Sequence, residues 1–258
     1  MQPWFSFVSY VKYLLRSRGP DSLHSPFVFR FYCDVLRNPY NFYAFETIED
    51  QRQRLLANRE EIRFFSLGAR QKEVRCRVGE MAAKSLLPTE KAMFLFQLAY
   101  WLRPAVVIEL GTCMGISTAY LASAHPSRVV SFEGIKALSD IAKGVWHNLG
   151  LSNIELMEGD IDQTLPAFAQ MEKAEADLIF VDANHTREAT LRYFRTLKTK
   201  ASPQACMVFD DIYWSEEMAS AWEEIKADPE VTVSIDLYHL GLVFFRKESP
   251  KENFIIRW

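Results

Sequence analysis

Residues 105–118 read AVVIELGTCMGIST, a pattern that predicts a strand, a glycine turn and a helix in succession. The first six residues form a short apolar run typical of a buried strand. Gly111 and Gly115 then allow a tight turn and a close approach of backbone to a ligand, and Ser117 and Thr118 can cap the helix. The spacing is G-x-x-x-G, not the G-x-G-x-x-G of dinucleotide loops. Alone, the stretch fits a cofactor loop and an ordinary turn equally well.

Six further apolar runs follow this first strand along the chain. They are Arg128–Glu133, Ile154–Glu158, Ala176–Val181, Ala205–Phe209, Thr232–Tyr238 and Leu242–Arg246. Helical segments separate the first five strands, which indicates a parallel sheet covered on both faces. A tight turn near Leu240-Gly241 joins the last two strands as an antiparallel hairpin at the sheet edge. The sequence therefore predicts an α/β fold with a Rossmann-like seven-strand sheet, mostly parallel, with an antiparallel terminal hairpin.

Residues 1–87 are predicted to form an N-terminal helical extension that is rich in aromatic residues, and residues 88–258 the domain that holds the sheet. Helices are expected at Pro3–Arg18, Pro26–Arg37, Thr47–Arg59, Val74–Ser85 and Thr89–Leu102. In the first of them, Phe7, Val11, Leu14 and Leu15 recur at helical spacing. We expect this layer to pack on the core or on a second subunit of a homodimer, in preference to lying on a membrane surface.

The composition excludes several classes of protein. With 258 residues, 49% of them hydrophobic, the chain can bury a full core. Its net charge of -3 offers no general attraction to nucleic acid. No apolar run approaches the roughly 18 residues of a membrane span. Cys33, Cys76, Cys113 and Cys206 form no C-x-x-C pair and follow no signal peptide, so we expect free thiols in a reducing cytoplasm.

Acidic residues stand at the ends of the second and third predicted strands. Glu133 ends the second strand, where a carboxylate can accept hydrogen bonds from both ribose hydroxyls. A surface glutamate at a strand end is the alternative. Asp160 follows the third strand in Glu158-Gly159-Asp160. It can accept a hydrogen bond from an adenine amino group, or it can simply form a Gly-Asp turn.

Three more carboxylates end the fourth and fifth predicted strands. Asp182, Asp210 and Asp211 should gather at the carboxyl edge of adjacent strands. Like charges this close need a proton or a cation, and oxygen ligands suit Mg²⁺, Ca²⁺ or Mn²⁺. His185 lies three residues after Asp182 and can act as a general base. The alternative is that the three aspartates cap helices and that His185 is a neighbour of one cap.

This ordered set of motifs resembles the class I S-adenosylmethionine-dependent methyltransferases. The likeness covers roughly residues 88–247. The form E-x-G-T-x-x-G-x-S-T, from Glu109 to Thr118, resembles the catechol and caffeoyl-CoA type O-methyltransferases. The Asp-x-x-His spacing of Asp182 and His185 is similar to metal-dependent macrolide-sugar O-methyltransferases. The family often has Asp-Asn where this chain has Asp210-Asp211.

The resemblance implies a fold, a cofactor and a set of site residues. It implies that the last strand is inserted antiparallel between its neighbours and that S-adenosyl-L-methionine is the cofactor. The implied cofactor-binding residues are Glu109, Gly111, Thr112, Gly115, Ser117, Glu133, Asp160 and Asp182. Asp182, Asp210 and Asp211 match the positions that hold Mg²⁺ or another divalent cation. His185, with Asp182, would carry out the catalysis of methyl transfer to a small-molecule hydroxyl.

Two rival functions and one further motif fit the sequence less well than a methyltransferase does. A nicotinamide-dependent oxidoreductase is disfavoured by the glycine spacing and the acidic trio. A non-catalytic, methyltransferase-like binding scaffold is disfavoured by the intact glycine loop. Asn38-Pro39-Tyr40 resembles part of the N-P-P-Y box of enzymes that methylate nucleic acid. No strand precedes it, so a turn is expected there.

Trp214 either packs a helix or lines the acceptor pocket.

Overall fold

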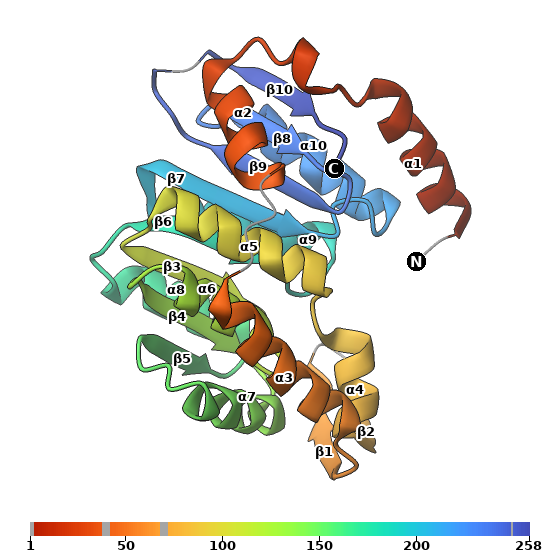
Figure 1. Cartoon of the computed structure of the whole chain (residues 1–258), viewed down its shortest axis with the longest axis vertical. Helices are drawn as coiled ribbons and strands as arrows, with labels where there is room; N and C mark the ends of the chain where they lie inside the picture. Colours follow the sequence, from red (N-terminus) through yellow and green to blue (C-terminus); the bar gives the residue numbers. More distant parts are fainter. Residues whose placement is uncertain (1–2, 38–41, 68–71, 249) are drawn as a thin grey trace. The chain divides into compact units, whose positions relative to one another are not determined.

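Residues 3–37, 42–67, 72–248 and 250–258 are described by the computed structural model, which divides into two units (Figure 1). We call Pro39–Glu172 the middle unit, and Met1–Asn38 together with Lys173–Trp258 the terminal unit. The turn predicted at Asn38-Pro39-Tyr40 lies outside the described residues. The predicted division into residues 1–87 and 88–258 stays a prediction.

Three parallel strands form the sheet of the middle unit. They are β3(Val106–Leu110), β4(Arg128–Glu133) and β5(Ile154–Glu158). Strand β4 lies between the other two and pairs Arg128 with Val106 and Glu133 with Glu158. Every residue of β3 is buried, as expected for a near-continuous apolar strand that is covered on both faces. The β4 and β5 bounds match the prediction, and β3 begins one residue later than predicted.

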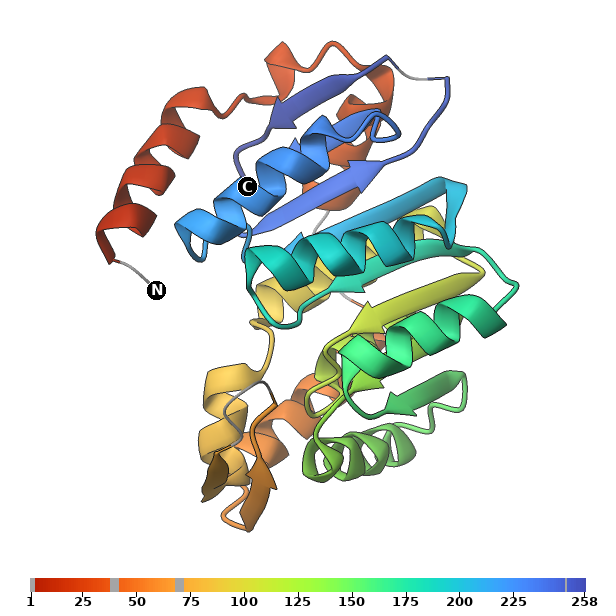
Figure 2. The same ribbon diagram turned by 180° about the vertical axis from the view of Figure 1, so that it is seen from behind.

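A helix follows each of these strands and carries the chain to the next one. The three helices are α6(Ile116–Ala124), α7(Lys136–Asn148) and α8(Ile161–Met171). Helix α8 lies in front of β3 and β4 in Figure 2. Its Phe168 packs edge-on against Phe132 of β4, with the ring centroids 5.4 Å apart. Two earlier helices, α3(Tyr43–Ala57) and α5(Thr89–Leu102), pack on α6, and α4(Val78–Ser85) packs on α3.

The N-terminal extension is not entirely helical, which corrects the prediction. Strands β1(Glu61–Phe65) and β2(Glu73–Arg77) pair antiparallel in a hairpin. The helix predicted over Val74–Ser85 begins only at Val78, because its first four residues belong to β2. Exposed and half-buried residues alternate along both strands. This period of two is typical of a strand with one covered face.

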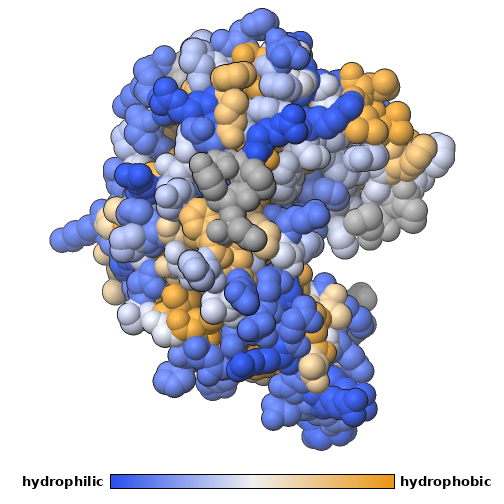
Figure 3. Space-filling model, viewed as in Figure 1, coloured by the Kyte–Doolittle hydropathy of each residue, from blue (hydrophilic) through white to orange (hydrophobic). Residues whose placement is uncertain are grey.

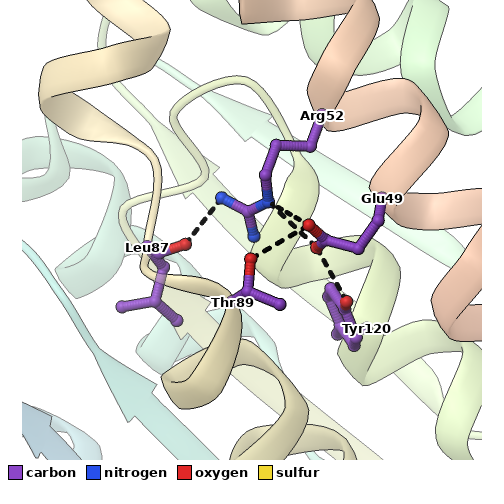
Figure 4. Close-up of polar contacts among 5 residues, drawn as sticks. All are labelled: Glu49, Arg52, Leu87, Thr89 and Tyr120. Atoms are coloured by element: carbon purple, nitrogen blue, oxygen red, sulfur yellow. Dashed lines mark hydrogen bonds and ion pairs between the residues drawn. The ribbon is translucent and has the colours of Figure 1, made fainter.

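A buried network holds α3 to the rest of the middle unit (Figure 4). The Nε–H of Arg52 lies 2.9 Å from both carboxylate oxygens of Glu49, and its Nη1 donates to the carbonyl of Leu87 at 2.8 Å. Glu49 also accepts hydrogen bonds from the hydroxyls of Thr89, at 2.9 Å, and Tyr120, at 2.8 Å. Burial, and the acceptance of this bond by Glu49, raise the pKa of Tyr120. The network therefore ties α3 to the start of α5 and to α6.

Removing one partner of this network is expected to be costly. In Glu49→Ala, the Arg52 side chain, only 8% exposed, loses its carboxylate. An uncompensated buried charge costs several kcal/mol, and we expect a loss of about 2–4 kcal/mol in the free energy of unfolding, measured by urea denaturation. Glu61→Ala is the matched control, because its pair with Arg75 has both side chains more than half exposed. Equal destabilisation by the two variants would contradict a structural role for the network.

The strands of the terminal unit lie in the order β6-β7-β9-β8-β10. Their bounds are β6(Ala176–Val181), β7(Ala201–Asp210), β9(Leu240–Phe244), β8(Val233–Asp236) and β10(Glu252–Ile255). Strand β9 runs antiparallel between β7 and β8, as the resemblance implied. The seven predicted strands are thus present. The short strand β10 is an eighth that was not predicted, and it pairs parallel to β8, so the terminal hairpin is not at the edge.

The turn between β8 and β9 is displaced from the predicted position. The Leu237 N–H donates to the carbonyl of Leu240 at 2.9 Å, so the turn precedes the Leu240-Gly241 pair. Gly241 lies inside β9. A Cβ at Gly241 would stand only 2.9 Å from the ring of Trp222. This glycine is therefore required by packing, a reason that the sequence alone does not distinguish from a turn.

Helices cover both faces of the terminal sheet. Helices α9(Arg187–Lys198) and α10(Glu216–Ala227) lie side by side on the face shown in Figure 2. The opposite face carries α2(Pro26–Phe31), whose Phe27 packs edge-on against Phe244 of β9 at 5.0 Å. The 3-10 helix η1(Pro20–Ser22) precedes α2, and the π-helix η2(Tyr32–Leu36) follows it. With the strands of both units, these layers confirm the predicted Rossmann-like α/β class.

The first helix, α1(Pro3–Arg16), packs through Tyr10 and Tyr13, whose ring centroids lie 5.0 Å and 5.4 Å from that of Tyr238. The hydroxyl of Tyr13 also donates to the carbonyl of Ile256 at 2.7 Å. The side chains of Phe7, Val11 and Leu15 are exposed. A search of the described residues finds no helix with both the length and the apolar character of a membrane span.

Candidate active site

The loop after β3 has the strained backbone that its glycines predicted. Gly111 has a φ of 100° and Gly115 a φ of 79°. Cys113 between them also has a positive φ, 51°, which is uncommon for a residue with a side chain. The N–H groups of Gly111 and Thr112 both lie 3.1 Å from the carbonyl of Phe132 in the neighbouring strand. The loop is therefore a defined, tightly folded structure at the carboxyl end of the sheet.

Gly115 is required by packing as well as by its φ. The indole Nε1–H of Trp146, on α7, donates to the Gly115 carbonyl at 2.9 Å. A Cβ at Gly115 would lie 2.5 Å from that nitrogen and 2.9 Å from the Cβ of Ala142. Trp146 thus fixes the start of α6. No motif around Trp146 in the sequence indicates this role.

A buried polar layer lies under the loop. Glu109 is fully buried, and its Oε2 accepts from the hydroxyls of Thr118 and Ser131, both at 2.5 Å. The hydroxyls of Ser131 and Thr112 are also 2.5 Å apart. Glu109 therefore ties the loop, the first turn of α6 and β4 together. Ser117, next to this layer, is buried as well. Direct contacts of Glu109, Thr112 and Ser117 with a cofactor stay predictions.

Glu133 at the end of β4 connects two loops. Its Oε2 accepts from the N–H of Cys113 in the glycine loop, and its Oε1 accepts from the N–H of Ile135, both at 2.8 Å. Burial raises the pKa of this carboxyl, and the backbone N–H donors, including that of Gly134, partly offset the rise. Glu133 is thus held rigidly beside the glycine loop. The role of Cys113, through its backbone, is one that the sequence did not reveal.

Asp160 begins α8 as its N-cap. Its carboxylate accepts from the N–H of Asp162 at 3.0 Å, a capping role that was not predicted for this residue. The preceding Gly159 has a φ of 124° and donates its N–H to the carbonyl of Glu133 at 2.9 Å. The ends of β4 and β5 are therefore linked, and Asp160 lies in the loop next to that of Glu133. Contact with an adenine group stays a prediction.

One residue of the unpredicted hairpin reaches these loops. Leu67, just after β1, lies so close to Gly134 that a Cβ there would overlap its Cδ1 atom. Helix α7 also packs on β1. The hairpin is therefore joined to the loop that carries Glu133. Only the alternation of polar and apolar residues in Glu61–Phe65 could have indicated this element.

In the terminal unit, Asp182 and His185 form a pair. The His185 Nε2 lies 3.2 Å from the Asp182 Oδ1. Burial acts to lower the pKa of His185. The hydrogen bond with Asp182 and the negative charges of Asp182, Asp211 and Asp210 outweigh burial and raise that pKa above its usual value. The imidazole is thus oriented by a carboxylate, an arrangement suited to a general base.

The predicted metal site is not formed by these side chains. Asp210 is buried at the end of β7, and Asp211 follows with a left-handed φ of 52°. No group of three or more His, Cys, Asp or Glu side chains in the described ranges is arranged to hold a metal ion. The Asp182 carboxylate contacts His185 instead. Strand order brings the backbones of such residues to one edge, but it does not determine where their carboxylates lie.

Trp214 lies near the pair of Asp182 and His185. This position is compatible with its predicted role of lining an acceptor pocket, which stays a prediction. Its ring centroid is 6.3 Å from that of His185, and its side chain is 38% exposed. Asn184, between Asp182 and His185, has a φ of 64° and donates from Nδ2 to the hydroxyl of Tyr193 at 3.1 Å. Asn184 therefore holds the segment before α9 through a hydrogen bond to that helix. The sequence did not indicate this role.

Comparisons with known proteins agree with the fold. Residues 108–212 match a protein-family model described as a methyltransferase domain. That range begins in β3 and ends just after Asp210-Asp211. No curated protein matches the sequence.

Several solved structures have the same fold at low sequence identity. The O-methyltransferase TomG from Streptomyces achromogenes, involved in tomaymycin synthesis and solved with SAM, has a TM-score of 0.60 at 17% identity, over 83% of this chain and 96% of that chain. The O-methyltransferase from Bacillus cereus, solved with SAH, has a TM-score of 0.58 at 19% identity, over 84% and 96%. The SAH-bound methyltransferase PaMTH1 from Podospora anserina has a TM-score of 0.59 at 16% identity, over 87% and 97%.

Proposed function

We propose that this chain, which carries a methyltransferase domain over residues 108–212, is an S-adenosylmethionine-dependent O-methyltransferase of a small-molecule hydroxyl. One observation carries the proposal. Glu133, at the end of the second strand of the domain, is bonded to the N–H of Cys113 in the glycine loop. A carboxylate in that position is suited to the two hydroxyls of a ribose. The TomG and Bacillus cereus O-methyltransferases, which share the fold, were solved with SAM and SAH.

The proposal gives each element of the middle unit a task. The Gly111 loop approaches the methionine part, Glu133 accepts from the ribose hydroxyls, and Asp160 accepts from the adenine. Glu109 positions the loop from below, since Thr118 and Ser131 occupy its Oε2. When bound, the cofactor supplies a methyl group on an electrophilic sulfonium sulfur. Because the methyl transfer is an in-line displacement, the protein mainly has to align the acceptor and remove its proton.

The proton of the acceptor is assigned to His185. In its neutral form the imidazole can accept the hydroxyl proton as the oxygen attacks the methyl carbon. Asp182, 3.2 Å away, orients the ring and stabilises the imidazolium that results. The methyl–sulfur bond breaks as the oxygen–carbon bond forms, so the products are a methyl ether, S-adenosylhomocysteine and a protonated histidine. Trp214 is near enough to shield this proton transfer from water.

A divalent cation is not part of this mechanism, because the side chains present do not fit one. The three predicted ligands, Asp182, Asp210 and Asp211, do not form a metal-holding group within the described residues. We therefore expect MgCl₂ or MnCl₂ to leave the melting temperature unchanged. A concentration of about 5 mM is enough to occupy most of a site with a dissociation constant of about 1 mM or less. Only a ligand that binds the folded state can raise the melting temperature. If the metal raises the melting temperature of the wild type and not that of Asp210→Asn, the predicted metal site is supported.

Transfer of a labelled methyl group tests the function itself. Full-length protein is incubated with tritiated S-adenosylmethionine and a panel of small phenols, catechols and sugar alcohols. Label should appear in an extractable ether that resists mild base, which would cleave a methyl ester. Transfer to nitrogen acceptors alone would contradict O-methylation. A nicotinamide-dependent oxidoreductase would instead oxidise such hydroxyls with NAD⁺, which the same panel can reveal by absorbance.

A further inference from the structure

Helix α1 packs on the terminal unit through one side and exposes an apolar side. The buried side carries Ser9 and Tyr13. The Tyr13 hydroxyl donates to the carbonyl of Ile256, and the Ser6 carbonyl accepts from the hydroxyl of Tyr238 at 2.8 Å. A helix that packs on a globular core normally exposes charged and polar residues on the opposite side. The exposed apolar side of α1 therefore exceeds what its packing on the terminal unit requires.

The exposed side is a continuous apolar stripe. Trp4, Phe7, Val11 and Leu15 follow one another at spacings of three and four residues, so they lie on one face of the helix. Trp4 is 77% exposed, Phe7 61% and Leu15 82%. Figure 3 shows hydrophobic side chains gathered over α1, at the upper right of that view. We call these four residues the α1 stripe.

Both charged residues of helix α1 are basic. Lys12 and Arg16 lie on the helix and are exposed, and Arg18 follows it. The first acidic residue of the chain is Asp21, beyond the helix. An apolar face with aromatic residues, flanked only by lysine and arginine, is typical of helices that lie in the interface of an anionic lipid layer. A surface of this charge is complementary to lipid phosphates.

The size of the stripe decides against a protein partner. A helix of 14 residues offers a strip of roughly 21 Å by 10 Å. That area is far below the roughly 800 Å² that each partner buries in a stable protein interface. A second copy of α1 would also bring its own basic residues against those of the first. A lipid surface requires no shape complementarity, and the binding strength scales with the buried apolar area and with the attraction to anionic lipids. We propose that α1 docks the protein on an anionic membrane surface through the α1 stripe.

Vesicle sedimentation tests this proposal with the full-length protein. The wild type should pellet with vesicles containing one part phosphatidylglycerol to two parts phosphatidylcholine, and much less with pure phosphatidylcholine. High salt should weaken the binding, since it screens the basic residues. Phe7→Ser with Leu15→Ser should lower the partition coefficient at least about tenfold, because two large apolar side chains no longer enter the lipid. Lys12→Glu with Arg16→Glu should abolish the preference for anionic vesicles.

Phe65→Ser with Met171→Ser is the matched control. These side chains are 62% and 82% exposed, almost the same as Phe7 and Leu15, but they lie in the middle unit. The control should pellet like the wild type, and unchanged melting temperatures should show that every variant is folded. No pelleting of the wild type, or equal losses in the α1 variant and the control, would overturn the proposal. So would sedimentation equilibrium showing a dimer that only the α1 variant dissociates, because the stripe would then be a homodimer interface.

Discussion

Gly111→Val should abolish the binding of S-adenosylhomocysteine, with a loss of more than a hundredfold from a dissociation constant in the micromolar range, which corresponds to about 8 kcal/mol of binding energy. Gly111 has a φ of 100°, a conformation that a β-branched residue adopts only at considerable strain. The same side chain would also project from the loop that is proposed to approach the methionine part of the ligand. Isothermal titration calorimetry of the purified variant measures the effect.

Gly150→Val separates loss of the site from general strain. Gly150 also has a positive φ, 67°, but a Cβ there would meet no atom within 4 Å. It lies after α7, away from the loop that follows β3. We expect this variant to be somewhat destabilised and to bind the ligand normally. Equal affinity of Gly111→Val and wild type, with the fold intact, would refute the assignment of the glycine loop.

His185→Ala should lower kcat by about 10²–10⁴-fold once an acceptor is known, which is the usual share of a general base. The affinity for S-adenosylhomocysteine should remain within about twofold, since His185 is not among the residues predicted to bind the cofactor. His147→Ala is the control, because His147 is exposed on α7. A fall in kcat of similar size in both variants would argue against a specific role for His185.

The pH dependence of the reaction follows from the same pair. A general base works only when deprotonated, so the rate should rise with pH through the pKa of His185, which lies above its usual value of about 6.5. Asp182→Asn removes the hydrogen bond and the negative charge that raise this pKa. The inflection should therefore move to lower pH, and the plateau rate should fall as the base weakens. NMR titration of His185 measures the pKa without an acceptor, and an unchanged pKa in Asp182→Asn would contradict the pairing.

Most of the sheet could be predicted because its strands are apolar and the residues next to them mark where they end. The strand at Val106–Leu110 is buried throughout, and positive φ angles at Gly111 and Gly115 follow it as the glycines indicated. Strand β10 was missed because its four residues, Glu252–Ile255, hold two polar residues and complete a pattern only beside β8. A short edge strand depends on its neighbour more than on its own sequence.

The N-terminal half was harder to predict because tertiary contacts outweigh local patterns there. The helical spacing of Phe7, Val11 and Leu15 indicated a buried face, yet hydrogen bonds at Tyr13 and Ser6 orient the opposite face of α1 inward. Val74–Arg77 fitted a helix by composition but pairs with β1 instead. Neither outcome is encoded within one helical turn of sequence.

The candidate site divides in the same way. The place of Glu133 could be predicted because it ends the second strand, and its carboxylate accepts a hydrogen bond from the glycine loop. Its contact with a ribose stays a prediction. The metal site stays a prediction, because the Asp182 carboxylate contacts His185, three residues further on, and the described side chains form no metal-holding group. Side-chain pairing of this kind depends on rotamers that strand order does not specify. Trp146, which donates a hydrogen bond to the Gly115 carbonyl, is remote from Gly115 in the sequence, so no local pattern predicted this contact.

Calorimetric titration of the wild-type protein with S-adenosylhomocysteine, and in parallel with NADH, tests the central claim most directly. We predict one site per chain with a dissociation constant in the micromolar range for S-adenosylhomocysteine, and no heat of binding for NADH. Glu133→Gln should weaken the first affinity at least about tenfold, because a charged acceptor for the ribose hydroxyls is lost. Binding of NADH, or of neither nucleoside by a folded protein, would contradict the assignment of this chain as an S-adenosylmethionine-dependent methyltransferase.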